Sequence, residues 1–179
     1  MNDADYDIAI IGGGLAGLCL AIQCAGAGFS AIVFEKETYP YHKVCGEYIS
    51  MESYDFICRL GLDLSMMRLP IIRQLQLTDV KGKLYEFALP LGGFGISRFI
   101  LDNALYRLAE KKGVHVLTAT KAEDIRFEEN KFTIITSKKR YTAKLAAGSF
   151  GKRSNMDIKW KRQGLVQKKD KLNNYIGVK

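Results

Sequence analysis

Three glycines and one glutamate near the start of the chain have the residue types and the spacing of a dinucleotide-binding turn. Gly12, Gly14 and Gly17 form a G-x-G-x-x-G fingerprint directly after an apolar run. Gly12 permits the tight turn, Gly14 lets the backbone approach a pyrophosphate, and Gly17 lets the following helix pack closely on the strand. The open N–H groups at the start of that helix attract phosphate, and the carboxylate of Glu35, which closes the next apolar run, accepts hydrogen bonds from a ribose. These residues predict a site for an adenine dinucleotide.

The elements that must position this turn lie in a segment without charge. No charged residue occurs between Ile8 and Phe34, an uncharged length that a transmembrane helix would also have. Six glycines interrupt the segment, so we predict a strand over 6–11, a buried helix over 15–25 and a second strand over 31–34.

Composition and charge narrow the class of protein. The chain has 179 residues, of which 47% are apolar, as in an ordinary soluble domain. The net charge is +8, but residues 138–179 carry +11 and leave −3 for the remainder. We therefore expect no nucleic-acid partner, while a peripheral contact between the basic C-terminal region and an anionic membrane stays open.

The cysteines and the N-terminal residues indicate the cellular compartment of the protein. The four cysteines form no C-x-x-C pair and have no histidine at metal-ligand spacing, so we expect reduced thiols and no metal site. Asp3, Asp5 and Asp7 stand where a signal peptide would carry lysine or arginine. These features indicate a cytoplasmic protein.

The rest of the chain reads as further helices and strands of an α/β protein. Ser50 is expected to cap a helix that Gly61 ends, and Ser97 to cap the best-specified helix. Alternating polar and apolar residues predict a hairpin and, later, an antiparallel meander. The expected elements are helices over 51–60 and 98–112, hairpin strands over 74–78 and 84–88, a loop over 90–95, a strand over 114–118, meander strands over 123–128, 131–136 and 141–147, and the start of a last strand over 174–178.

With these motifs in hand, the sequence resembles the N-terminal part of FAD-dependent oxidoreductases of the geranylgeranyl-reductase-like group, relatives of the aromatic hydroxylases and flavin halogenases. The fingerprint followed by Glu35 and Lys36 is one motif, and the Tyr39–Ser50 loop with its Cys45-Gly46 pair is the second. Ile96-Ser97-Arg98, leading into a helix, is the third. Residues 148–154 are also similar to the third glycine motif of that group.

The resemblance implies a fold and a domain plan. The fold would be a Rossmann-like FAD-binding domain with a parallel sheet, an antiparallel β-meander and part of a second antiparallel sheet. Residues 1–179 would form an incomplete FAD-binding domain, because the Gly-Asp motif that follows in the group is absent. Residues 62–97 would begin an inserted substrate-domain segment, and 155–179 would begin a second, truncated one.

The resemblance also implies cofactor contacts but assigns no catalytic residue, since the flavin ring carries the redox chemistry. Arg98 would contact the FAD from the side, and the backbone of Ala122, at the end of its strand, would contact the adenine. Cys45 is either a small buried side chain or a neighbour of the flavin. The full set implied is Gly12, Gly14, Leu15, Ala16, Gly17, Glu35, Lys36, Cys45, Gly46, Arg98 and Ala122.

Three functions remain open at this point. The resemblance favours hydride transfer from reduced FAD to a carbon–carbon double bond of a small hydrophobic substrate, isoprenoid or polyketide-like, with NAD(P)H as electron donor. The alternative enzyme is a flavin monooxygenase that uses NAD(P)H and O2, although Phe150 stands where the hydroxylases have an acidic residue. A third reading is a non-catalytic or degenerate dinucleotide-binding fragment, for which the missing Gly-Asp motif is the reason.

Overall fold

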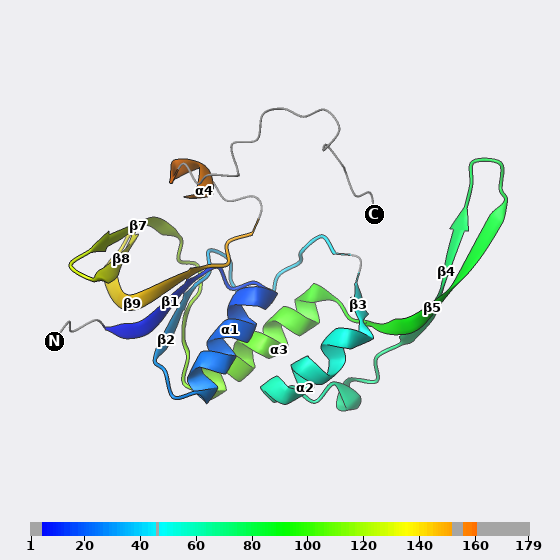
Figure 1. Ribbon diagram of the computed structural model, residues 1–179, viewed down its shortest axis with the longest axis horizontal. Coiled ribbons are helices and arrows are strands. Elements are labelled where there is room, and N and C mark those ends of the chain that lie inside the picture. Colours follow the sequence, from blue (N-terminus) through cyan, green and yellow to red (C-terminus); the bar gives the residue numbers. More distant parts are fainter. Residues whose placement is uncertain (1–4, 46, 152–155, 161–179) are drawn as a thin grey trace.

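The computed structural model describes residues 5–45, 47–151 and 156–160. Two sheets and a layer of helices make up this part of the chain (Figure 1). In chain order the elements are β1 (Tyr6–Ile11), α1 (Leu15–Gly26), β2 (Ala31–Phe34), β3 (Tyr48–Ser50), the 3-10 turn η1 (Met51–Ser53), α2 (Tyr54–Leu60), the 3-10 turn η2 (Leu64–Met67), β4 (Ile71–Thr78), β5 (Leu84–Gly95), α3 (Arg98–Lys111), β6 (His115–Leu117), β7 (Ala122–Glu128), β8 (Lys131–Thr136), β9 (Arg140–Gly148) and α4 (Met156–Lys159).

The larger sheet has the strand order β6-β2-β1-β9-β8-β7. The first four of these strands run parallel, and β9, β8 and β7 form the antiparallel meander that extends the sheet at one edge. Strand β1 lies in the middle, where Ile8 is in register with Ala31 of β2 and with Leu145 of β9. This arrangement confirms the predicted α/β class and places the end of β1, where the fingerprint begins, at the centre of the sheet.

Two helices cover one face of this sheet. Figure 1 shows α1 and α3 side by side, and the two helices are in contact. Full burial of one large aliphatic side chain contributes about 1.5–3 kcal/mol, so a core of several such residues holds the start of α1 firmly against the sheet. The core residues that join these layers are Ile10, Leu18, Ala21, Ile22, Val33, Leu101 and Leu105.

The predicted caps of α3 are confirmed. The Ser97 side chain accepts a hydrogen bond from the Ile100 N–H at 3.3 Å, and the helix ends at Lys111 ahead of Gly113, which has φ of +84°. A serine at the N-cap and a glycine beyond the last turn satisfy backbone groups that the helix ends leave open. Helix α3 is therefore fixed at both ends, which matters because its first turn carries Arg98.

The prediction of a loop over 90–95 is wrong. Strand β5 continues through this segment to Gly95 and pairs with β4. It also pairs with β3, which forms at the end of the Tyr39–Ser50 loop. A Cβ built on Gly93 would lie 2.5 Å from the Ile49 carbonyl oxygen. The glycines here allow two backbones to approach closely, which is a role of glycine inside strands rather than a loop signal.

The helix predicted from residue 51 begins later than expected. Ser50 belongs to β3 and makes no capping hydrogen bond, and the 3-10 turn η1 precedes α2. Gly61, with φ of +109°, ends α2 as predicted. The predicted strand over 174–178 and most of the segment 155–179 lie outside the described residues.

The uncharged segment between Ile8 and Phe34 folds as strand, helix and strand, as predicted. Within the ranges the structure describes, no helix is long and apolar enough to cross a membrane.

Candidate dinucleotide site

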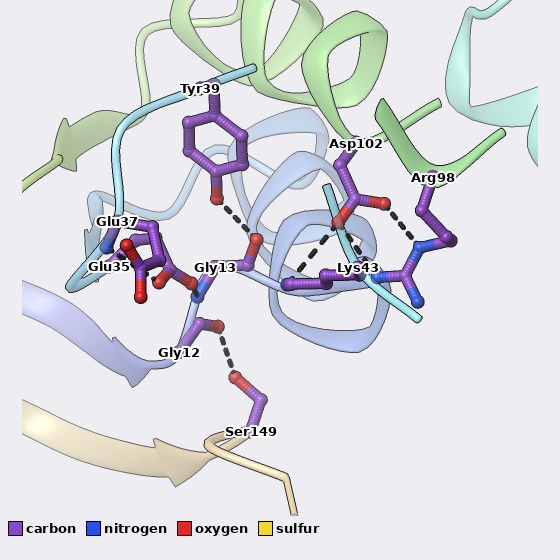
Figure 2. Close-up of polar contacts among 9 residues, drawn as sticks. All are labelled: Gly12, Gly13, Glu35, Glu37, Tyr39, Lys43, Arg98, Asp102 and Ser149. Carbon is purple, nitrogen blue, oxygen red and sulfur yellow. Dashed lines mark hydrogen bonds and ion pairs between the residues drawn. The ribbon is translucent and has the colours of Figure 1, made fainter. Parts of the chain in front are cut away.

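The turn after β1 depends on glycine at several positions. Gly12 has φ of +112°, and a Cβ there would lie 2.5 Å from the Ser149 carbonyl oxygen. A Cβ on Gly17 would collide with the Gly12 carbonyl and lie 2.6 Å from Ser149 Oγ. The Ser149 hydroxyl, which follows β9, donates to the Gly12 carbonyl at 2.6 Å (Figure 2). Gly12 and Gly17 therefore make the turn and pack the helix against it, as their spacing predicted.

Gly14 differs from its neighbours because space lies above it. The nearest atom to a Cβ built on Gly14 is Lys43 Nζ, at an ordinary 3.7 Å. Gly14 is the N-cap of α1 without a capping side chain, and the first turn contains no acidic residue. Open N–H groups with room beside them are what a helix N-terminus offers to phosphate. Leu15 and Ala16 lie at this same helix start, Leu15 half-buried and Ala16 exposed.

Glu35 lies at the end of β2 and is bound into the turn. Its carboxylate is 5% exposed, with Oε2 accepting the Gly13 N–H at 2.8 Å and Oε1 accepting the Glu37 N–H at 3.0 Å. Each carboxylate oxygen has a second lone pair, so a ribose contact stays a prediction compatible with this geometry. Lys36 points to solvent and pairs with Glu37 at 3.6 Å.

Tyr39 and Tyr41 line the same region and were not identified from the sequence. The Tyr39 hydroxyl donates to the Gly13 carbonyl (Figure 2). The Tyr39 ring stacks on Tyr106 at 4.5 Å between centroids. Burial, and next the charge of Glu35, raise the pKa of both Tyr39 and Tyr41, so both phenols stay neutral. Their only sequence signal was the density of aromatic residues in the loop after Lys36, which periodicity cannot place.

A buried carboxylate beside the turn holds two cations. Asp102 is 2% exposed and accepts from Arg98 Nε at 2.6 Å and from Arg98 Nη2 at 2.8 Å. Lys43 Nζ lies 3.4 Å from the same carboxylate (Figure 2). Burial works against the charge of Arg98, but the hydrogen bonds to Asp102 outweigh it and raise the guanidinium pKa. Cys45 also contributes to the raised pKa of Arg98, so the structure brings these two predicted residues close to each other.

Ala122 is the first residue of β7, in register with Thr136, and so lies at one end of its strand. Its backbone contact with the adenine stays a prediction. Its side chain is buried in the apolar cluster that includes Ile11 and Phe34. Gly46 lies outside the described residues.

Comparison with known proteins shows which proteins this part of the chain is similar to. Residues 7–42 match the family described as FAD binding domain. The "Menaquinone reductase" of Mycobacterium tuberculosis (strain ATCC 25618 / H37Rv) is 25% identical over 133 residues, 72% of this chain and 33% of the relative. A Pseudomonas fluorescens "1H-pyrrole-2-carbonyl-[peptidyl-carrier protein] chlorinase" is 40% identical over 62 residues, 35% of this chain and 14% of the relative. The chain thus spans a third or less of the length of these curated relatives.

Solved structures of flavin-dependent enzymes have a similar fold. The FAD-dependent chondrochloren halogenase of a myxobacterium has a TM-score of 0.71 at 26% identity, covering 86% of this chain and 39% of that chain. The p-nitrophenol 4-monooxygenase of Pseudomonas putida DLL-E4 has a TM-score of 0.73 at 21% identity, covering 83% of this chain and 42% of that one. The fold is therefore the Rossmann-like FAD-binding fold of flavin-dependent enzymes. The finer resemblance to the geranylgeranyl-reductase-like group stays a prediction.

Proposed function

We propose that this chain is the FAD-binding part of a flavin-dependent oxidoreductase. The observation that carries the proposal is the open, uncapped start of α1 above Gly14, in a segment that matches an FAD-binding family. Three neighbouring glycines would clash if they carried a side chain, whereas the space above Gly14 is free for a ligand. The residues present therefore fit the diphosphate of FAD.

The chain's own residues would bind and orient the cofactor. The backbone N–H groups of Leu15, Ala16 and Gly17 face the diphosphate, and the carboxylate of Glu35 accepts from the ribose. Arg98, whose guanidinium has five N–H donors and gives two to Asp102, keeps others for the flavin side of the site. Bound FAD supplies the redox chemistry itself.

For the reaction, we favour hydride transfer to a carbon–carbon double bond of a small hydrophobic substrate, isoprenoid or polyketide-like. The similarity to a relative named as a reductase supports this choice, as does the resemblance of the loop around Cys45 to that group. NAD(P)H is the proposed electron donor. We further propose a cytoplasmic enzyme without a nucleic-acid partner, whose basic C-terminal region contacts anionic membrane.

A flavin monooxygenase using NAD(P)H and O2 is the second candidate. The shared fold with a p-nitrophenol monooxygenase and with halogenases favours it. A non-catalytic FAD-binding fragment is the outcome to be excluded, since this chain covers a third of its curated relatives.

The test is the visible spectrum of the purified protein after reconstitution with FAD, recorded with and without NADPH, in air and under nitrogen. The proposal predicts a yellow protein that NADPH bleaches under nitrogen. Oxygen consumption that depends on added substrate would select the monooxygenase. A yellow protein that NADPH does not bleach would leave only the non-catalytic fragment, and a colourless protein would contradict FAD binding.

A further inference from the structure

One buried carboxylate pairs with two cations beside the start of α1. Two cations, Lys43 and Arg98, share the single carboxylate of Asp102, which is 2% exposed. Arg98 takes both carboxylate oxygens in a bidentate pair, at 2.6 and 2.8 Å, while Lys43 reaches one of them at 3.4 Å. Charge-assisted bidentate pairs are the stronger ones, so the Lys43 ammonium is the cation with charge left over.

Lys43 is held in one position despite its long, flexible side chain. Its ammonium lies 4.6 Å from the centre of the Tyr41 ring in addition to its contact with Asp102. Its side chain is 27% exposed, whereas Lys36 in the same loop is 69% exposed. A lysine fixed in this way has already lost much of the rotamer entropy that binding an anion would cost it.

The place where Lys43 is held faces the fingerprint turn. Its Nζ is the atom nearest to a Cβ built on Gly14, at 3.7 Å, so the ammonium borders the open space at the start of α1. That helix end contributes roughly half a unit of positive charge and carries neither a capping side chain nor an acidic residue. Glu35, the other nearby carboxylate, is occupied by the Gly13 and Glu37 N–H groups.

We propose that Lys43 binds the diphosphate of FAD directly, from the side of the space opposite to the helix N–H groups. This inference rests on the proposed function, because it assumes that FAD occupies this turn. A diphosphate carries two negative charges, and the helix end alone compensates only part of them. The Lys43 ammonium, partly desolvated and preorganised, supplies the remaining point charge.

The opposing interpretation is that Lys43 serves only the ion pair with Asp102. The two interpretations differ in which ligands they affect. If Lys43 contacts the diphosphate, replacing it weakens the binding of FAD and ADP, which carry the diphosphate. The binding of riboflavin and adenosine then stays unchanged. If Lys43 has a purely structural role, replacing it either changes the affinity for all four ligands together, through the fold, or changes the affinity for none of them.

The experiment compares Lys43→Gln with Lys111→Gln, an exposed lysine at the far end of α3, in titrations of the whole chain with FAD, ADP, riboflavin and adenosine. A charged hydrogen bond is worth about 1.5–3 kcal/mol, so we expect Lys43→Gln to raise the Kd for FAD and ADP roughly 10- to 150-fold. Riboflavin and adenosine should bind as to wild type, and Lys111→Gln should match wild type for every ligand.

Lys43→Arg keeps the charge and guards against a folding defect in the glutamine variant. Its Kd for FAD is expected to lie within a few-fold of the wild-type value. Added KCl should weaken its ADP binding as it does in wild type. Equal Kd values for FAD in wild type and Lys43→Gln would overturn the inference while leaving the proposed function intact. Failure of the wild-type chain to bind FAD would overturn both.

Discussion

A substitution at Gly14 separates the effect on folding from the effect on cofactor binding most clearly. Replacing Gly14 by alanine adds a methyl group where the nearest neighbour, Lys43 Nζ, is 3.7 Å away, so nothing in the free protein has to move. The backbone there has φ of −77° and ψ of −174°, an extended conformation that any residue adopts. The methyl group instead occupies the space that we assign to the diphosphate.

The expected magnitudes follow from these contacts. Alanine is a poorer N-cap than glycine, which costs about 1 kcal/mol of the free energy of unfolding. Pushing the diphosphate off even one helix N–H removes a charged hydrogen bond of about 1.5–3 kcal/mol, which raises the Kd for FAD roughly 10- to 150-fold. Gly14→Ala should therefore be folded and deficient in FAD.

The assay pairs urea unfolding with a fluorescence titration of FAD, and Gly17→Ala serves as the matched control. At position 17 the methyl group would meet the Gly12 carbonyl and Ser149 Oγ, so this variant should lose several kcal/mol, about 3 or more, of unfolding free energy. FAD binding by Gly14→Ala as tight as wild type would refute the assignment of the diphosphate to this turn. Unfolding of Gly14→Ala to the same extent as Gly17→Ala would refute the geometry.

Three further predictions concern the surroundings of the turn. Tyr39→Phe keeps the ring stack but leaves the buried Gly13 carbonyl without its donor, so urea unfolding should show a loss of about 1–3 kcal/mol. Glu35→Gln places an amide N–H opposite a backbone N–H, and the same assay should show a loss of similar size, about 1–3 kcal/mol, together with weaker FAD retention. Hydrogen bonds from Lys144, the largest cause, and from Ser30 lower the pKa of Asp7 from 3.8 to about 2. This carboxylate therefore stabilises the fold above pH 3.8, and the effect is lost as the pH falls through about 2. Lys144→Gln should move the Asp7 pKa, measured by NMR titration, back toward 3.8.

Each of these has a contrary result. Unchanged stability of Tyr39→Phe would mean that the Gly13 carbonyl finds another donor. Wild-type stability of Glu35→Gln would mean that the carboxylate does not hold the turn. An Asp7 pKa that stays near 2 in Lys144→Gln would assign the shift to Ser30, the other residue that hydrogen-bonds to this carboxylate.

The parts of the fold predicted well were those whose signals are local. The strand, turn and helix around Gly12 follow from an apolar run cut by glycines, and α3 follows from its periodicity and its Ser97 cap. Strand β5 was missed beyond residue 88 because glycines read as a loop. Only the pairing of Gly93 with neighbours on both sides gives those glycines their meaning, and that pairing is not local.

The candidate site divides in the same way. The fingerprint and Glu35 were found because their spacing is a property of one short βαβ unit. Tyr39 and Lys43 come from an irregular loop, and what they contact depends on where α3 presents Tyr106 and Asp102. No periodicity encodes the path of such a loop, so these partners emerge only from the folded chain.

The most direct measurement of the central claim is a crystal structure of the chain with FAD bound. The account predicts the diphosphate within hydrogen-bonding distance of the N–H groups of Leu15, Ala16 and Gly17, with Gly14 in van der Waals contact and the ribose near Glu35. A diphosphate bound elsewhere, with this turn unchanged and empty in the same crystal, would contradict it.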